Sequence, residues 1–349
     1  MGSKQRNRQG YTAALIVAAL TFMLLAACGS NNDKAGNAAS TESVGAEQPA
    51  PSQEQEAAPP EEETKPDEPT ERTLVDPLGH EVVVPAKPQR VLASYLEDYL
   101  VALGVVPVAQ WSVGGSPMGY LQEELANVQT VPHDLPYEVV TSLEPDLILI
   151  GDEALIADGK YDTYSKIAPT YALGQEVNAD WRKALLKVGE VLGKDEEAQA
   201  VLDSYNQELQ SAREKIDAAY DGKRPSTTAI WLVSKTFWMV SDNQSSGDVL
   251  YKDLGLAVPE LVARISKGEG GIWKSVSMEA LTELDADHIF LINSDSASGS
   301  EALQDPVWQS IKAVKNGNVH EYPANSSWLY TGIIANRQIV GDVLESLAP

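Results

Sequence analysis

The chain has few of the residues that usually carry metal or thiol chemistry. Its 349 residues include one cysteine and four histidines. A single cysteine can form no internal disulfide. The histidines stand far apart in the sequence, which weakens a site for a free zinc or manganese ion, because its ligands must converge on the metal. The sequence therefore predicts no metal ligands.

The motifs of common enzymes are also absent. The sequence has no G-x-S-x-G, Walker A, G-x-G-x-x-G or H-E-x-x-H pattern, and we therefore expect no catalytic residues and no enzyme activity. Basic residues are scarce as well, because 26 Lys and Arg stand against 51 Asp and Glu, a formal charge of −25. This acidity disfavours nucleic acid and anionic lipid as partners.

The N-terminal segment has the pattern of an export signal. Three basic residues within the first eight precede an apolar run at 11–25, which is too short for a membrane span and typical of a signal peptide. The Leu-Ala-Ala-Cys sequence at 25–28 is similar to a bacterial lipobox. This resemblance implies cleavage after a signal peptide at 1–27 and acylation of the Cys28 thiol, for example by palmitate. The alternative is a plain secretory signal with an incidental cysteine.

A polar segment follows the cysteine. Residues 28–72 are rich in Ala, Glu, Pro, Ser and Gln and contain almost no large apolar side chains. Such a composition cannot bury enough surface to offset the entropy of ordering, so we expect a disordered acidic tether. Removing the signal peptide takes away three positive charges and brings the formal charge to −25 − 3 = −28.

The rest of the chain is organised around one pattern that occurs twice. Residues 136–150 and 277–291 align without a gap at an offset of 141 residues. Five positions are identical: Glu138/Glu279, Thr141/Thr282, Leu143/Leu284, Asp146/Asp287 and Ile148/Ile289. Many α/β proteins contain a short helix followed by a buried strand, so a chance similarity between the two segments is the alternative. Because the offset is about half of everything after residue 72, the repeat predicts two similar lobes.

Each copy predicts a short helix, a turn and a buried strand. Glu138 and Glu279 fall in the first helical turn, where the helix dipole favours an anion. The runs at 147–150 and 289–292 are continuously apolar, as expected of strands covered on both faces.

The alternation of strand and helix patterns defines the predicted fold class, α/β with mostly parallel sheets. We expect an N-terminal α/β lobe at 73–194 and a C-terminal α/β lobe at 222–349. Between them, an apolar stripe over 195–221 predicts one long helix. At about 1.5 Å per residue this helix is roughly 40 Å long and can join the two lobes, with a ligand cleft between them.

These features together resemble the ABC-transporter substrate-binding proteins that bind ferric siderophores and vitamin B12 and carry a rigid helix between their lobes. The resemblance covers residues 73–349 and rests on the lipobox, the tether, the turn at 76–79 leading to 88–91, the repeat and the long helix. It implies a monomeric receptor, lipid-anchored to the outer face of the bacterial cytoplasmic membrane. The receptor would capture a ferric siderophore, make a modest lobe movement and hand the ligand to an ABC permease, with no permanently bound cofactor.

The resemblance also implies roles for particular residues. In that family an exposed glutamate on each lobe docks into arginine pockets of the permease, and Glu138 and Glu279 match those positions. The alternative is that each merely complements a helix N-terminus. Trp273, Trp328 and Tyr330 match aromatic residues of the cleft in the ferric-hydroxamate-binding relatives. The alternative for each tryptophan is ordinary core packing.

The first lobe departs from the family pattern. Those relatives carry an arginine just ahead of the docking glutamate, where this chain has His-Asp-Leu-Pro at 133–136. We expect Arg182 and Lys235 near the cleft instead, with Trp111 and Ser112 as weaker first-lobe candidates; the two cations can also be ordinary solvated charges. So few cations favour a ferric complex of low negative charge, such as a hydroxamate or a mixed citrate–hydroxamate.

Other functions stay open. The same scaffold could bind cobalamin or haem, and Tyr330 would then be the candidate axial ligand of a haem iron. A hydrolytic lipoprotein enzyme would need a nucleophile, base and orienting group in contact, and no spacing indicates one. A structural surface module would need neither a small ligand nor Glu138 and Glu279.

Overall fold

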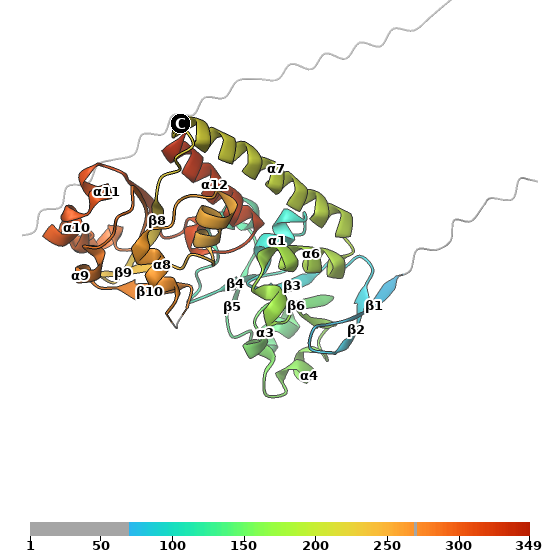
Figure 1. Cartoon of the computed structure of the whole chain (residues 1–349). Coiled ribbons are helices and arrows are strands. Elements are labelled where there is room, and N and C mark those ends of the chain that lie inside the picture. The colour runs from blue at the N-terminus through green and yellow to red at the C-terminus, as the bar shows by residue number, and fades with distance from the viewer. Residues whose placement is uncertain (1–69, 269–270) are drawn as a thin grey trace, which may run out of the picture. The chain divides into compact units, whose positions relative to one another are not determined.

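The computed structural model describes residues 70–268 and 271–349 (Figure 1). These residues belong to one compact unit, Lys65–Pro349. The predicted signal peptide, Cys28 and nearly all of the predicted tether lie outside the described residues. Within the described ranges, no helix combines the length and the apolar character that are needed to cross a membrane.

The N-terminal lobe contains two parallel sheets and a hairpin. In the larger sheet the strand order is β3-β6-β7, all three strands run parallel, and their residues are buried, as the apolar runs predict. The strands of this lobe are β1 (Glu71–Val75) and β2 (Glu81–Pro85) of the hairpin, β3 (Val91–Ser94), β6 (Leu147–Ile150) and β7 (Thr170–Ala172) of the larger sheet, and β4 (Gln110–Ser112) and β5 (Thr130–Pro132) of the smaller one.

Helices flank these strands (Figure 1). They are α1 (Glu97–Ala102), η1 (Gly119–Leu121), α2 (Gln122–Leu125), α3 (Tyr137–Ser142), η2 (Glu153–Ile156), α4 (Lys160–Tyr164), α5 (Gln175–Asn178) and α6 (Trp181–Leu192). Helix α6 starts where the Asp180 carboxylate accepts the N–H of Arg182 at 3.1 Å. It ends at Gly193, whose φ of +70° suits a residue without a side chain.

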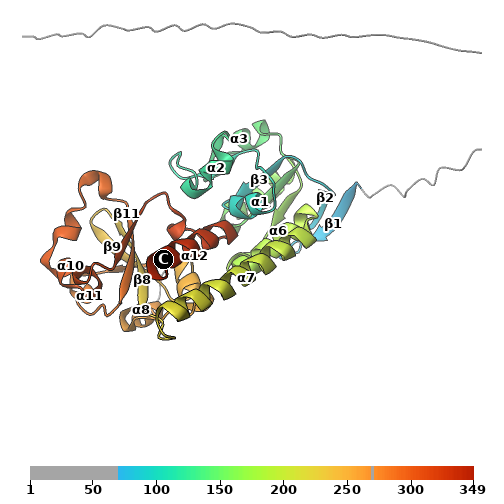
Figure 2. The ribbon, with the colours of Figure 1, turned by 90° about the horizontal axis from the view of Figure 1, so that it is seen from above.

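One long helix, α7 (Asp195–Ala219), follows α6. The sequence predicted this helix over 195–221, and its 25 residues span about 37 Å at a rise of ~1.5 Å each. The helix packs against α6 at one end and against α12 (Ile333–Leu347), the last helix of the chain, as Figure 2 shows. Its buried residues repeat at helical spacing, which is the predicted apolar stripe: Ala198, Leu202, Tyr205, Leu209, Ala212 and Ile216.

The C-terminal lobe is built on one five-stranded sheet of order β10-β9-β8-β11-β12. Strands β8, β11 and β12 run parallel, whereas β9 is antiparallel to both of its neighbours. The strands are β8 (Thr227–Val233), β9 (Thr236–Val240), β10 (Trp273–Val276), β11 (His288–Asn293) and β12 (Val319–Pro323).

The helices of this lobe are mostly short. Besides α12 they are η3 (Asp248–Asp253), a π-helical segment, α8 (Glu260–Ser266), α9 (Met278–Leu281), η4 (Ser296–Ser298), η5 (Glu301–Gln304), α10 (Pro306–Ser310), α11 (Lys312–Lys315) and η6 (Ser327–Leu329). The extended backbone of Ile311 separates α10 from α11.

The repeat seen in the sequence is the same local structure in both lobes. Helix α3 leads into β6, and α9 leads into β11. The aspartate that both copies share joins the strand of its copy to the neighbouring parallel strand. Asp146 accepts the N–H of Arg90 at 2.9 Å, and Asp287 accepts the N–H of Ser226 at 3.0 Å. Arg90 and Ser226 each directly precede the first parallel strand of their lobe. The chain therefore forms two similar α/β lobes, each with sheets of its own, joined by α7.

Candidate functional site

A cavity of about 320 Å³ lies between the two lobes. From the N-terminal lobe it is lined by Tyr95, Tyr99, Asn178, Ala179, Asp180 and Trp181; from the C-terminal lobe it is lined by Asn243, Gln244, Ser245, Asp248, Lys252, Ile272 and Thr331. Its volume falls in the range of small-molecule sites, which hold mostly apolar walls and a few placed polar groups.

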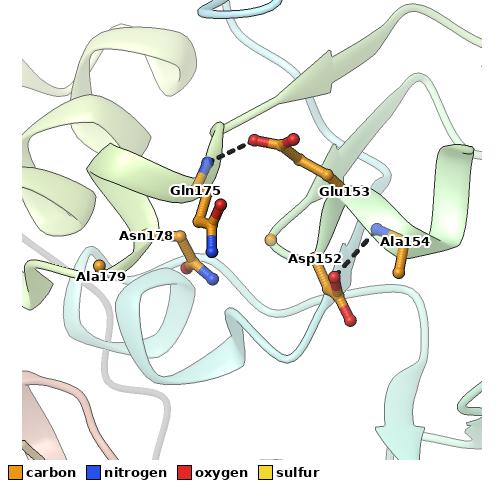
Figure 3. A pocket seen from close by; sticks show the side chains of 7 residues that line it. Asp152, Glu153, Ala154, Gln175, Asn178 and Ala179 are labelled. Atoms are coloured by element: carbon orange, nitrogen blue, oxygen red, sulfur yellow. Dashed lines mark hydrogen bonds between the residues drawn. The ribbon is translucent and has the colours of Figure 1, made fainter.

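A second cavity, of about 430 Å³, shares Asn178 and Ala179 with the first. It opens at Gly151, directly after the carboxyl end of β6, which is the edge at which open α/β sheets bind ligands. Figure 3 shows the side chains of Asp152 and Glu153 on one side of this cavity and those of Gln175 and Asn178 on the other. The Glu153 carboxylate accepts the backbone N–H of Gln175, which ties the two sides together.

Four aromatic rings form a continuous wall beside the inter-lobe cavity. Tyr95 is 43% exposed and lies between Trp111, whose ring centroid is 4.8 Å away, and Tyr330, at 6.2 Å. Tyr120 adds a fourth ring, 5.0 Å from Tyr330. We call these four residues the aromatic wall. It joins Trp111 of one lobe to Tyr330 of the other, as expected if both face one ligand.

The sequence reasoning did not single out Tyr95. The residue takes a left-handed backbone conformation, with φ of +59°, and lies ahead of α1, which begins at Glu97. A signal for it was present, because Tyr95 directly follows the carboxyl end of β3, the place where ligand contacts gather in α/β sheets.

The prediction that Trp328 lines the cleft is wrong. Its side chain is 0% exposed. The indole stacks on Phe290, with centroids 4.7 Å apart, and packs against Tyr322 at 5.2 Å. Its N–H donates to Asp342 Oδ2 at 2.8 Å. Trp328 is a core residue of η6, and this explains why a large aromatic stands there.

Trp273 lies closer to the cavity. It is half-buried at the start of β10 and directly follows Ile272, which lines the inter-lobe cavity. Its ring meets Trp231 edge to face at 6.2 Å, and the Trp231 indole donates to Ser294 Oγ at 2.8 Å. A ligand contact by Trp273 stays a prediction, and Trp231 is a neighbour that the sequence reasoning did not single out.

Arg182 is held by carboxylates of the opposite lobe. Its Nη2 lies 2.6 Å from Asp253 Oδ1, and its Nη1 lies 3.6 Å from Asp248 Oδ2. The guanidinium also stacks over the ring of Trp181 at 4.1 Å. The positive charge that was expected to face a ligand is therefore balanced within the protein, next to the cavity that Asp248 lines. A direct ligand contact by Arg182 stays a prediction.

Lys235 lies in the turn between β8 and β9. Its ammonium is 2.7 Å from Glu301 Oε2, and this pairing raises the pKa of Lys235. The residue is not part of the lining of either cavity described above. Its proposed role at the ligand stays a prediction.

The charge on the cavity walls is predominantly negative. Four carboxylates, Asp152, Glu153, Asp180 and Asp248, line the two cavities. The lysine in the lining, Lys252, lies 3.5 Å from Asp248 Oδ1.

The two repeat glutamates are exposed in the first turns of α3 and α9. Ser277 accepts the N–H of Ala280 at 3.3 Å and so begins α9. The pKa of Glu279 is lowered by its own backbone N–H and by the Ser277 hydroxyl. Glu138 and Glu279 are thus accessible carboxylates at matching places in the two lobes; their docking role stays a prediction.

His288 and His320, on neighbouring strands, are brought together with ring nitrogens 3.1 Å apart. Burial is the main cause that lowers the pKa of each imidazole. Among residues 70–268 and 271–349, no group of three or more His, Cys, Asp and Glu side chains is placed to hold a metal ion.

A buried acid supports the aromatic wall. Glu97 is 1% exposed; its Oε1 accepts the backbone N–H of Trp111 at 2.6 Å, and its Oε2 has no hydrogen-bond partner among the described residues. Burial raises the pKa of Glu97 from 4.5 to about 8. The carboxyl is therefore largely protonated at neutral pH.

Glu97→Gln is expected to stabilise the protein increasingly as pH rises. Because the folded pKa of about 8 lies above the unfolded value of 4.5, the free energy of unfolding falls between these two pH values. The loss in the free energy of unfolding reaches about 3 kcal/mol at pH 7. Glutamine does not ionise and therefore avoids this loss, and its amide oxygen still accepts the N–H of Trp111. Urea unfolding at pH 4.5 and at pH 7 measures the difference. Glu123→Gln on the exposed face of α2 is the control, and a gain independent of pH would contradict the assignment.

Two α/β lobes joined by one long helix, with an aromatic and polar cavity between them, define a bilobed solute-binding protein. The chain belongs to the periplasmic binding protein family, whose model matches residues 93–326. The fold, the resemblance seen in the sequence and this match agree.

Relatives of this chain are iron- and siderophore-binding proteins. It is 28% identical over 279 residues to the iron(3+)-hydroxamate-binding protein YxeB of Bacillus subtilis, covering 77% of this chain and 83% of YxeB. It is 25% identical over 213 residues to the Fe(3+)-citrate-binding protein YfmC of the same organism, covering 60% and 64%. The solved FhuD protein from S. pseudintermedius has the same fold, with a TM-score of 0.65 at 23% identity over 80% of this chain and 98% of that one.

Proposed function

We propose that this protein captures a ferric siderophore of the hydroxamate or citrate–hydroxamate type and delivers it to an ABC permease. The observation that carries the proposal is the aromatic wall, which spans both lobes beside the inter-lobe cavity. The iron-hydroxamate and iron-citrate relatives support the same ligand class.

The chemistry of the ligand fits this wall. A ferric siderophore is bulky and partly apolar, and its iron is already fully coordinated. The protein then needs to supply aromatic surface and outer hydrogen bonds rather than metal ligands. Tyr95, Trp111 and Tyr330 provide the rings, and the amides of Asn178 and Gln244 line the same cavity.

The charges of the site limit the class of ferric complex that it can bind. The carboxylates of the two cavities repel anions, and Arg182 is already neutralised by Asp253. A tricatecholate complex, which carries several negative charges, would need unpaired cations around it. The site therefore favours a ferric complex of low negative charge.

Haem is a weaker candidate for the same scaffold. An axial tyrosine binds haem iron best as a phenolate. Burial raises the pKa of Tyr330, which opposes the loss of the phenolic proton that such axial ligation needs. Cobalamin stays as an alternative that only binding can decide.

The proposal includes the membrane anchor. The lipobox at 25–28 and the acidic tether at 28–72 support acylation of Cys28 and a place on the outer face of the cytoplasmic membrane. The receptor would act as a monomer that makes and breaks no covalent bond, with a ferric siderophore as its ligand and no permanently bound cofactor.

Calorimetric titration of the protein with ferric hydroxamate, citrate–hydroxamate and catecholate complexes, haem and cobalamin tests the function. We expect one-to-one binding of the first two classes with a Kd below about 1 µM. Binding of haem or cobalamin alone would overturn the ligand class, and no binding together with ester hydrolysis would favour an enzyme.

Tyr95→Ala is expected to weaken that binding about tenfold, because it removes the ring that lies between Trp111 and Tyr330 and lines the cavity. The same titration measures the loss. Tyr161→Ala is the matched control, since Tyr161 stacks on His80 away from the inter-lobe cavity. Equal affinities for the two variants would remove Tyr95 from the site.

A further inference from the structure

The last helix of the C-terminal lobe is capped by a side chain of the N-terminal lobe. No side chain of its own segment caps α12, whose N-cap residue is Gly332. Instead, Asp98 of α1 accepts the N–H of Ile334 through Oδ1 at 3.0 Å and the N–H of Ala335 through Oδ2 at 3.0 Å. The Tyr120 hydroxyl donates to the same Oδ2 at 2.9 Å. One carboxylate thus satisfies two N–H groups that a helix start leaves unpaired.

The contact is buried and close. Asp98 is only 2% exposed. A Cβ atom at Gly332 would lie 2.2 Å from the Asp98 carboxyl carbon, so glycine is required there for the two lobes to approach. Burial raises the pKa of Asp98, and the hydrogen bonds that its carboxylate accepts oppose that rise. Hydrogen bonds in such a dry place are stronger than at the surface.

We call the hydrogen bonds from Ile334 and Ala335 to Asp98 the clasp. The clasp joins the two segments that face each other across the inter-lobe cavity. Asp98 follows Tyr95 by three residues, and Ile334 follows Thr331 by three. Tyr95 and Thr331 both line the inter-lobe cavity, and Tyr330 completes the aromatic wall beside Tyr95. A displacement of the cap therefore changes the separation of the rings.

We propose that Asp98 is a positioning residue that sets the width of the ligand cavity by capping α12 across the lobes. Helix α7 connects the lobes covalently, and Arg182 adds an ion pair to Asp253 at the cavity margin. The Asp98 clasp adds a buried connection between the backbone of one lobe and a carboxylate of the other. Its effect on ligand binding rests on the function proposed above; its effect on lobe separation does not.

Distance measurements between spin labels on the two lobes test the clasp without ligand. Labels at Asp162→Cys on α4 and Lys315→Cys on α11, both exposed, are placed in a Cys28→Ser background. Asp98→Asn keeps the size of the side chain but turns one acceptor into a donor facing an N–H. We expect it to broaden the inter-lobe distance distribution and to raise the dissociation rate of a ferric trihydroxamate about tenfold.

Asp305→Asn is the matched control. Asp305 caps α10 within one lobe by accepting the N–H of Val307 at 2.8 Å, so this variant makes the same substitution at a helix start and alters none of the inter-lobe contacts described above. Its distance distribution is expected to equal that of the unsubstituted protein. If Asp98→Asn fails to fold, Tyr120→Phe, which removes one donor to the same carboxylate, is expected to broaden the distribution to a smaller degree.

An Asp98→Asn distribution as narrow as that of Asp305→Asn would overturn the proposal and leave Asp98 as a structural cap. The same holds for Tyr120→Phe if that variant has to replace it and shows no change. Because these distances need no ligand, the result stands even if no siderophore binds. Tight siderophore binding with unchanged distances would contradict the clasp alone.

Discussion

Replacing Glu138 and Glu279 together by lysine is expected to reduce ferric siderophore uptake at least about tenfold. If the two carboxylates dock on arginine pockets of a permease, as the family resemblance implies, the lysines would place like charges against each other. The two carboxylates are exposed at equivalent places of the repeated unit. Neither lies in the lining of the described cavities, so the affinity for the ligand should not change. Uptake of radioactive iron by cells that carry only the variant measures the effect, and calorimetry measures the affinity.

The control for this experiment is a second charge reversal at helix starts. Glu196 in the first turn of α7 and Glu260 in the first turn of α8 are also exposed. Glu196→Lys with Glu260→Lys changes the net charge equally and loses similar helix-dipole stabilisation, roughly 0.3–1 kcal/mol per site. Uptake by this control should stay near the unsubstituted rate. Equal uptake by both double variants would refute the docking role.

Trp328→Ala is expected to lower the free energy of unfolding by about 3–5 kcal/mol, the range for a large aromatic removed from a core. The substitution deletes the stack on Phe290 and the contact with Tyr322. It also removes the indole that donates to Asp342, which leaves a half-buried carboxyl without that donor. Urea denaturation followed by circular dichroism measures the loss.

Two further variants distinguish a core role from a ligand role. Trp328→Phe keeps most of the stacking and should recover more than half of the lost stability. Trp273→Ala, at a half-buried ring near the cavity, should cost distinctly less stability than Trp328→Ala. If Trp328→Ala instead unfolds like the unsubstituted protein but binds ligand poorly, the core assignment is wrong.

The architecture could be predicted because it follows from local patterns. Continuous apolar runs predicted β6 and β11, and the spacing of buried residues predicted α7 within two residues of its observed end. The repeat predicted equivalent lobes, and the matching hydrogen bonds of Asp146 and Asp287 give its structural basis.

The direction of a side chain could not be predicted in the same way. Two serines directly precede Trp328 in the sequence, a pattern typical of an exposed loop, yet Ser327 and Trp328 are both buried. Flanking polarity describes the backbone segment and not the side to which each residue turns. Tyr95 was missed for a related reason, because its left-handed backbone removes it from the helix that its neighbours form.

Contacts between segments that are distant in the sequence could not be predicted either. Arg182 bonds to Asp253, 71 residues away, and Asp98 bonds to Ile334, 236 residues away. Each contact depends on how the two lobes meet, which no pattern within one segment contains. The sequence could therefore point to a site between the lobes, whereas the neutralised arginine and the clasp required the folded structure.

Anomalous scattering at the iron edge, from crystals grown with a ferric trihydroxamate, tests most directly whether the two lobes hold an iron complex between them. We expect one anomalous peak in the inter-lobe cavity beside Tyr95 and Tyr330, with the iron ligated by the siderophore alone. A peak ligated by protein side chains, a peak away from this cavity, or no peak at saturating ligand would contradict it.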